Sequence, residues 1–210
     1  ARKLAPVIRK VLLELEEALQ EEKEFDHNSH RVFRIMASDY AESTLIPILL
    51  QKINKVAPNM TIDIMTPSDV TFHDVEEGKI DMAINRFDEL PQSFYQKTLW
   101  RDSFTCMLNA DNPIVNKFNL NSYLASKHVW VSKTGFGVGV GMNPHDVQKL
   151  GWVDEALNRL GKKRDIKVFT RSYNVAMQLS LQDDLIATLP TQAALIHQNN
   201  SDYTLLEPPF

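Results

Sequence analysis

Short β-branched and apolar runs alternate with segments of helical periodicity from residue 31 to residue 206, and this alternation constrains the fold more than any other feature. Strands are expected at 31–37, 61–65, 80–84, 103–108, 128–131, 166–170, 185–189 and 203–206. Helices are expected between them, one through Leu45, Leu49, Ile53 and Val56 and the others at 70–77, 120–125, 152–160, 173–182 and 191–197. Such alternation is typical of α/β folds with parallel sheets and right-handed crossovers.

The length of the chain permits two small lobes. Its 210 residues suffice for one large domain or two small ones. No sequence repeat relates the two halves, and two α/β lobes fit the element lengths better than one continuous sheet. We expect lobe I at residues 27–101 and lobe II at residues 102–207.

Residues 1–26 precede this alternation and predict a helix of their own. Its apolar positions recur at the spacing of a coiled-coil seam and are Leu4, Ile8, Val11, Leu15 and Ala18. The charged residues at 21–26 lead away from any core. A dimerisation helix is therefore favoured, and a terminal helix packed on its own domain is the alternative.

Composition excludes several classes of partner. The net charge of −4 gives no basic field with which this chain alone would hold nucleic acid. Cys106 is the single cysteine, which rules out an internal disulfide and favours a reducing cytosol. No apolar run approaches the roughly 18 residues that span a bilayer, and residues 1–25 have no signal-peptide pattern. We expect a cytoplasmic protein without membrane contact.

No catalytic or metal-binding pattern stands out. The glycine-rich run at 134–141 follows a strand, but its spacing differs from a dinucleotide-binding loop. His27 and His30 lie in a polar linker without a third ligand nearby in sequence, and Cys106 in an apolar strand fits an inert buried thiol. The sequence has neither Gly-x-Ser-x-Gly nor His-Glu-x-x-His. We expect a binding protein with no catalytic residues, no metal and no cofactor.

Polar residues follow most of the expected strands. The exits hold Ser38 and Asp39, 66–68, 85–86, 132–134 and 171–173. In open α/β lobes, ligands bind where strand ends meet helix N-termini. Each Ser or Thr taken alone fits a helix cap. The set as a whole favours a cleft for a small polar or anionic organic molecule.

The order of several segments resembles the linker helix and effector-binding region of LysR-type transcriptional regulators over essentially the whole chain. The resembling segments are LAPVIRKVLLELEEAL, FRIMASDYAESTLIPILLQKINKVAPN, GKIDMAINRFDELPQSFYQKTLWRDSFTCMLNADNPI and SYNVAMQLSLQDDLIATLPTQAA. The ASDY, RFDELP, TGFG and IATLP turns are most similar to the branch of nodulation and naphthalene-degradation regulators.

This resemblance implies a fold and an assembly. The fold is two Rossmann-like lobes of the type-2 periplasmic-binding-protein class, joined by two crossover strands. The linker helix would pair two copies in a homodimer or homotetramer. Operator DNA would bind only through a winged helix-turn-helix domain that precedes this chain.

The resemblance also implies an effector site between the lobes. Matched onto this sequence, its lobe I wall is Ser38, Asp39, Thr66 and Arg86, and its lobe II wall is Phe136, Ser172, Tyr173 and Thr188. Phe136 and Tyr173 would sandwich an aromatic ring, and Arg86 would pair with a carboxylate.

Two features depart from the family pattern. The family continues beyond Phe210 with a strand and a helix that complete lobe I, so residues 208–210 are expected to turn back toward that lobe. Residues 142–150 look like an insertion that would cover the pocket or a subunit interface. A solute-binding protein of a transporter with the same fold is the main alternative function, and an enzyme that uses the cleft is a second.

Overall fold

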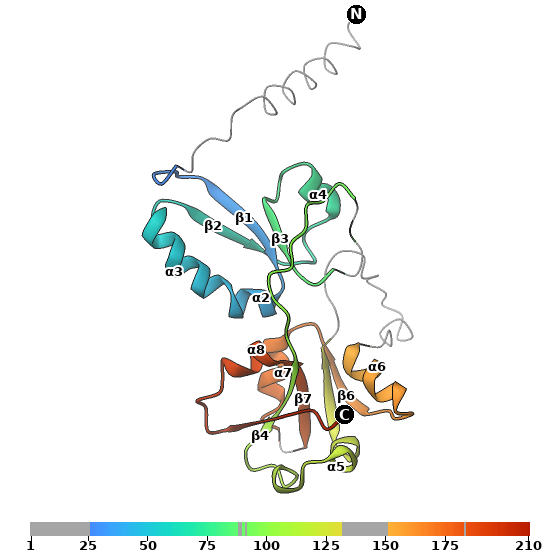
Figure 1. Ribbon diagram of the computed structural model, residues 1–210. Helices are drawn as coiled ribbons and strands as arrows, with labels where there is room; N and C mark the ends of the chain where they lie inside the picture. The colour runs from blue at the N-terminus through green and yellow to red at the C-terminus, as the bar shows by residue number, and fades with distance from the viewer. Residues whose placement is uncertain (1–25, 88–89, 91, 132–150, 183) are drawn as a thin grey trace, which may run out of the picture.

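The structure, a computed structural model, describes residues 26–87, 90, 92–131, 151–182 and 184–210. Two α/β lobes lie one above the other (Figure 1). The expected helix at 1–26, with Leu4, Ile8, Val11, Leu15 and Ala18, lies outside the described residues, apart from Asp26. Phe136 and the segment 142–150 also lie outside them.

Lobe I contains a parallel sheet with strand order β2-β1-β3. Its strands are β1 (Val32–Ala37), β2 (Thr61–Met65) and β3 (Met82–Ile84). Alternate residues of β1 face opposite ways: Ile35 packs in one cluster with Ala41 and Ile46, and Met36 packs with Val70 and Ile80 in another. The helices are α2 (Asp39–Thr44), α3 (Ile46–Val56) and α4 (Phe72–Glu76).

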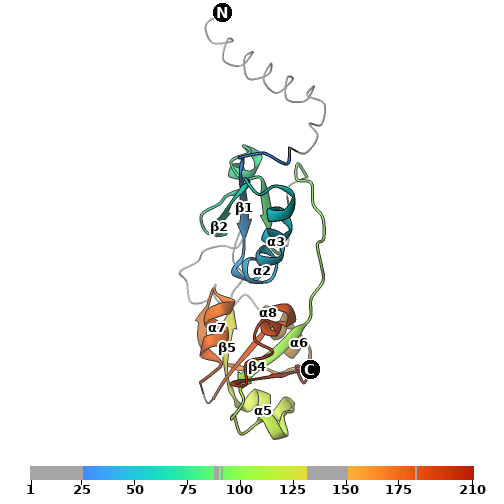
Figure 2. The same cartoon turned by 90° about the vertical axis from the view of Figure 1, so that its left-hand side faces the viewer.

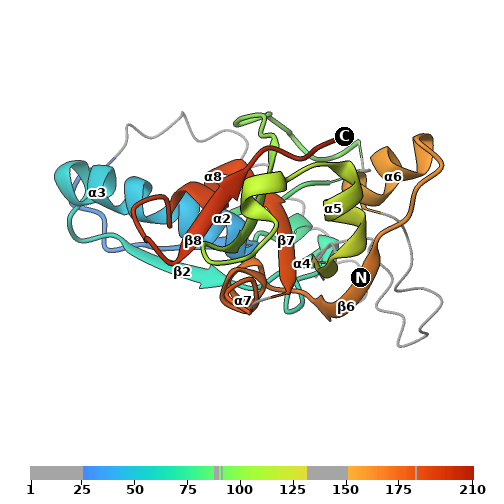
Figure 3. The ribbon, with the colours of Figure 1, turned by 90° about the horizontal axis from the view of Figure 1, so that it is seen from below.

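Lobe II contains a mixed sheet with strand order β6-β5-β7-β4-β8. The strands are β4 (Phe104–Asn109), β5 (Lys127–Val131), β6 (Asp165–Thr170), β7 (Leu185–Pro190) and β8 (Tyr203–Leu206). The helices are α5 (Leu120–Ala125), α6 (Trp152–Arg159), α7 (Tyr173–Leu179) and α8 (Thr191–Leu195), with a 3₁₀ turn, η1, at Val115–Lys117. Seen from below, α5 and α7 lie on either side of β7 (Figure 3).

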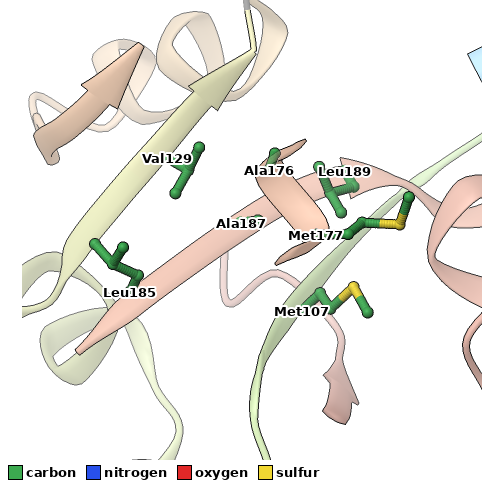
Figure 4. Close-up of a cluster of buried hydrophobic side chains, with 7 residues drawn as sticks. All are labelled: Met107, Val129, Ala176, Met177, Leu185, Ala187 and Leu189. Atoms are coloured by element: carbon green, nitrogen blue, oxygen red, sulfur yellow. The ribbon is translucent and has the colours of Figure 1, made fainter. Parts of the chain in front are cut away.

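Both faces of the lobe II sheet are covered by apolar clusters. One cluster joins the sheet to α7 and consists of Met107, Val129, Ala176, Met177, Leu185, Ala187 and Leu189 (Figure 4). The other joins the sheet to α5 and α6 and includes Cys106, Tyr123 and Leu157. Because β7 is buried along its whole length, its sequence LIATLP is apolar without alternation.

The structure corrects three expectations about the elements. β4 runs antiparallel to both β7 and β8, so the sheet of lobe II is mixed rather than parallel. The helix expected through Leu45 is preceded by a separate short helix, α2, which was not expected; Pro47 lies in the first turn of α3, where its missing N–H is tolerated. Residues 208–210 do not turn back toward lobe I: the ring of Phe210 lies 5.3 Å from that of Tyr123 inside lobe II.

The described residues connect the lobes through a long segment between β3 and β4. This segment runs down one side of the molecule (Figure 2). It carries Trp100 and Asp102, both of which contact α2 through Tyr40. The connection therefore brings α2 of lobe I against α7 and α8 of lobe II.

Candidate functional site

The start of α2 lies against the N-terminus of α7, at the boundary between the lobes. Ser38 caps α2, since its hydroxyl accepts from the Ala41 N–H. The next side chain, Asp39, reaches into lobe II. Its Oδ2 accepts from the Ser172 hydroxyl at 2.8 Å, the Tyr173 N–H at 2.5 Å and the Asn174 N–H at 3.4 Å. One carboxylate oxygen of lobe I is thus held by donors of lobe II.

A second carboxylate ties α2 to α8. The Tyr40 hydroxyl donates to Asp102 Oδ2 at 2.6 Å and accepts from Trp100 Nε1 at 2.8 Å. The same Asp102 oxygen accepts from the Gln192 N–H in the first turn of α8, at 3.1 Å. Burial and the neighbouring carboxylate raise the pKa of Tyr40, so the phenol keeps its proton and remains a donor.

Aromatic rings lie beside these hydrogen bonds between the lobes. The Tyr40 ring lies 6.0 Å from the ring of Tyr173, edge to face, and 6.0 Å from the ring of Trp100. Burial raises the pKa of Tyr173 to about 12. The boundary therefore offers aromatic surface together with neutral hydroxyl groups.

Arg86, just beyond β3, makes a further contact between the lobes. Its guanidinium lies over the ring of Trp152 at the start of α6, 3.4 Å from the ring centroid. The positive charge of Arg86 also acts to lower the pKa of Tyr173, against the larger effect of burial. The charge of Arg86 in lobe I therefore acts on the Tyr173 hydroxyl in lobe II.

The structure brings together five of the eight residues expected at the effector site. These are Ser38, Asp39, Arg86, Ser172 and Tyr173. Thr66 is placed in the turn after β2, where its hydroxyl bonds to Ser68 at 2.9 Å and Asp69 at 2.7 Å. Thr188 is buried in lobe II, with its hydroxyl 2.8 Å from that of Tyr123. Phe136 lies outside the described residues.

Several side chains that contact across the boundary belong to no sequence motif and were not predicted as site residues. Tyr40, Trp100, Asp102 and Trp152 join the two lobes, yet only Tyr40 lies beside an expected strand exit. Trp100 and Asp102 belong to the connecting segment, whose path sequence periodicity does not specify. The available signal was a run of aromatic and charged residues, YQKTLWRD, between two expected strands.

Lobe II also holds a buried polar group that is separate from the boundary. Arg164 forms a bidentate pair with Asp154, through Nε at 2.7 Å and Nη2 at 2.8 Å. His128 is fully buried, and its Nε2 lies 2.8 Å from the Tyr123 carbonyl oxygen. Burial lowers the pKa of His128 to about 4 and raises that of Cys106 to about 12. A neutral imidazole and a protonated thiol in an apolar interior are structural groups.

Two hollows lie elsewhere on the molecule. One, of about 290 Å³, is in lobe I beside α4 and includes Arg34, Asp69 and Asp74. The other, of about 500 Å³, is in lobe II between β4, α6 and residues 207–210. Of the seven expected effector residues that the structure describes, none lines either hollow.

The described part of the chain holds no group of three or more His, Cys, Asp or Glu side chains placed to bind a metal ion. Among the same residues, no helix is long and apolar enough to cross a bilayer. The polar groups gathered at the lobe boundary suit binding of an organic molecule, since they are hydroxyls, a guanidinium and aromatic rings.

The sequence is similar to those of known transcriptional regulators. NahR, an HTH-type transcriptional activator of Pseudomonas putida, is 26% identical over 197 residues, which are 92% of this chain and 62% of NahR. The chain thus spans about three fifths of that relative's length.

Two solved structures share the fold. The regulatory domain of MexT, a transcriptional activator of Pseudomonas aeruginosa, superposes with a TM-score of 0.67 at 27% identity, covering 85% of this chain and 83% of that one. The effector-binding domain of QuiR, solved in complex with shikimate, gives a TM-score of 0.62 at 16% identity, covering 85% and 81%.

The model of one protein family matches residues 27–209, which include every described element of both lobes. That family is the LysR substrate-binding domain. The fold expected from the sequence, with its two lobes, is confirmed by this match and by the neighbouring structures. The chain belongs to the LysR substrate-binding-domain family.

Proposed function

We propose that this chain is the effector-binding and oligomerisation region of a LysR-type transcriptional regulator. A small organic effector binds between the two lobes and changes their arrangement. The change passes through the helix at residues 1–26 to an N-terminal winged helix-turn-helix domain, which binds operator DNA. The assembly is a homodimer or homotetramer in the cytoplasm.

The observation that carries this proposal is the meeting of polar and aromatic residues from both lobes at one boundary. Ser38, Asp39 and Arg86 come from strand exits of lobe I, and Ser172 and Tyr173 from an exit of lobe II. Ligands of open α/β folds bind at such strand ends. The shikimate complex of QuiR and the activator name of NahR support the same reading.

The chemistry of the boundary favours an effector that has an aromatic ring, a carboxylate or both. Arg86 supplies a cation, and Tyr173 supplies a ring beside the ring of Tyr40. Phe136 remains part of this proposal as a second ring, and Thr66 and Thr188 as hydroxyl contacts. An effector acts because its affinity differs between lobe arrangements.

Thermal unfolding against a panel of small aromatic and aliphatic carboxylates tests the proposal. A compound that binds only the folded chain, at about 100 times its Kd, stabilises it by about 2.7 kcal/mol. That is a rise in Tm of several degrees for a chain of this size. A panel without any shift contradicts a carboxylate effector.

A solute-binding protein of a transporter is the alternative with the same fold. The names of the relatives favour a regulator. Light scattering after size exclusion separates the two, because solute binders are usually monomeric. Residues 1–210 are expected to elute as a dimer or larger, and a monomer would favour the transporter reading.

A further inference from the structure

The contact between Asp39 and the start of α7 joins the two lobes through one side chain. A single carboxylate oxygen from lobe I accepts from three donors of lobe II, Ser172 Oγ, Tyr173 N and Asn174 N. Hydrogen bonds to an ionised carboxylate are shorter and stronger than bonds between neutral groups. The bonds from the Tyr173 N–H at 2.5 Å and the Ser172 hydroxyl at 2.8 Å are the two shortest of the three.

The second tie acts on the same short helix. Tyr40 follows Asp39 in α2 and donates to Asp102, which also accepts from the first turn of α8. α2 is therefore held at two neighbouring points, by one helix start through Asp39 and by another through Asp102. Helix α2 contacts both α7 and α8 of lobe II.

This arrangement uses the groups that the proposed site would offer. The Ser172 hydroxyl and the Tyr173 N–H point to Asp39 and already have an acceptor. Two donors of the lobe II wall are thus already paired with the protein's own carboxylate.

We propose that Asp39 is an interlobe latch, an autoinhibitory contact that holds the two lobes in this arrangement in the absence of effector. The regulatory role of this latch rests on the proposed function, because it requires an effector that binds between the lobes. The latch favours the arrangement in which Asp39 contacts α7, and an effector that engages Ser172 and Tyr173 does so after Asp39 is released. Tyr40 and Asp102 hold α2 in place so that Asp39 stays in register with α7.

Distances between spin labels in the ligand-free chain test the latch. The labels are attached at Lys52→Cys in α3 and Lys163→Cys after α6, two exposed positions, one in each lobe. Cys106 is fully buried, so the label does not react with it. In this background the wild-type latch is expected to give one narrow distance distribution. Asp39→Asn removes the negative charge and is expected to give a broader distribution with a longer component.

Two further variants keep the test decisive. Ser172→Ala removes one donor from the other side of the latch and is expected to broaden the distribution in the same direction as Asp39→Asn. Asp111→Asn replaces an exposed carboxylate in lobe II, outside the boundary, and is expected to leave the distribution unchanged. Circular dichroism establishes that each variant is folded.

A narrow distribution that is the same in wild type, Asp39→Asn and Ser172→Ala overturns the latch. A broad distribution already present in the wild type overturns it as well. Both results are obtained without ligand, so they leave the proposed effector site untouched. Conversely, failure of the carboxylate panel leaves the latch standing as a contact between lobes.

Discussion

Single residues at the lobe boundary show how far sequence reasoning reaches. Ser38, Asp39, Ser172 and Tyr173 were expected there because polar residues at strand exits gather at one edge of a parallel sheet. That reasoning specifies an edge but no partner, and the bond between Asp39 and the start of α7 could not be foreseen. Partners across the boundary depend on how the two lobes are placed, which no periodicity encodes.

Thr188 shows what the sequence leaves open. The family resemblance assigns its hydroxyl, near the end of β7, to the cleft, and that assignment stays a prediction. In the structure the hydroxyl lies 2.8 Å from Tyr123 and 3.6 Å from the Cys106 sulfur, inside lobe II. A one-residue change of position along a strand exchanges its two faces, and sequence alone left that choice open.

Arg86 provides the first prediction. Arg86→Ala is expected to weaken binding of a carboxylate effector by about 1–3 kcal/mol, because a charged hydrogen bond is lost. The measurement is calorimetric titration with a compound that raises Tm in the carboxylate panel. Arg159→Ala, on an exposed site of α6, is the matched control and should leave the affinity unchanged. Equal affinity of Arg86→Ala and wild type removes Arg86 from the site.

His128 provides a prediction about pH. Its pKa is about 4 in the folded chain and near 6.5 in a model peptide. Between these values the unfolded chain binds a proton that the folded chain does not. The free energy of unfolding therefore falls as pH falls from about 6.5 to about 4, by up to about 1.4 kcal/mol per pH unit from this group.

Urea unfolding at several pH values checks this expectation. His128→Gln lacks the titrating group and should show a correspondingly shallower pH dependence over this range. The same slope in both chains would mean that His128 does not carry the effect.

At the scale of elements, periodicity predicted most helices and strands, because local patterns decide them. α5 at Leu120–Ala125 and β8 at Tyr203–Leu206 have the expected bounds. The direction of β4 was missed, since the antiparallel pairing of β4 with β7 joins segments about eighty residues apart and leaves no local mark. The short helix α2 was missed, because the periodicity predicted one helix through Leu45, Leu49, Ile53 and Val56; Pro47, in the first turn of α3, marks where the second helix begins.

The pair between Arg164 and Asp154 gives a prediction at this scale. It fixes the start of α6 to the segment before β6, and the side chain of Arg164 is only 3% exposed. Asp154→Asn leaves a buried guanidinium without its counter-charge and is expected to cost about 3–5 kcal/mol of unfolding free energy. Guanidinium chloride unfolding measures the loss.

A control on the same helix isolates the effect of burial. Glu155→Gln changes the neighbouring, exposed carboxylate and should alter stability by less than about 1 kcal/mol. If Asp154→Asn cost no more than Glu155→Gln, the pair would not be a structural tie.

At the scale of the whole molecule, the two lobes meet at one boundary and are joined by the segment between β3 and β4. The connecting segment carries Trp100 and Asp102, and α2 carries Asp39 and Tyr40, so both sides of the boundary are tied near the same point. Arg86 on Trp152 adds a contact at α6. Under the proposed function, a molecule that enters this boundary would change the contacts that set the relative position of the lobes.

The distance between the lobes with and without effector is the measurement that tests this account most directly. Spin labels at Lys52→Cys and Lys163→Cys report it, and the ligand is the compound with the largest thermal shift in the carboxylate panel. The account predicts a different distance distribution at saturation, with the change weakened in Arg86→Ala at the same ligand concentration. Saturating binding with an unchanged distribution would contradict an effector site that acts by moving the lobes.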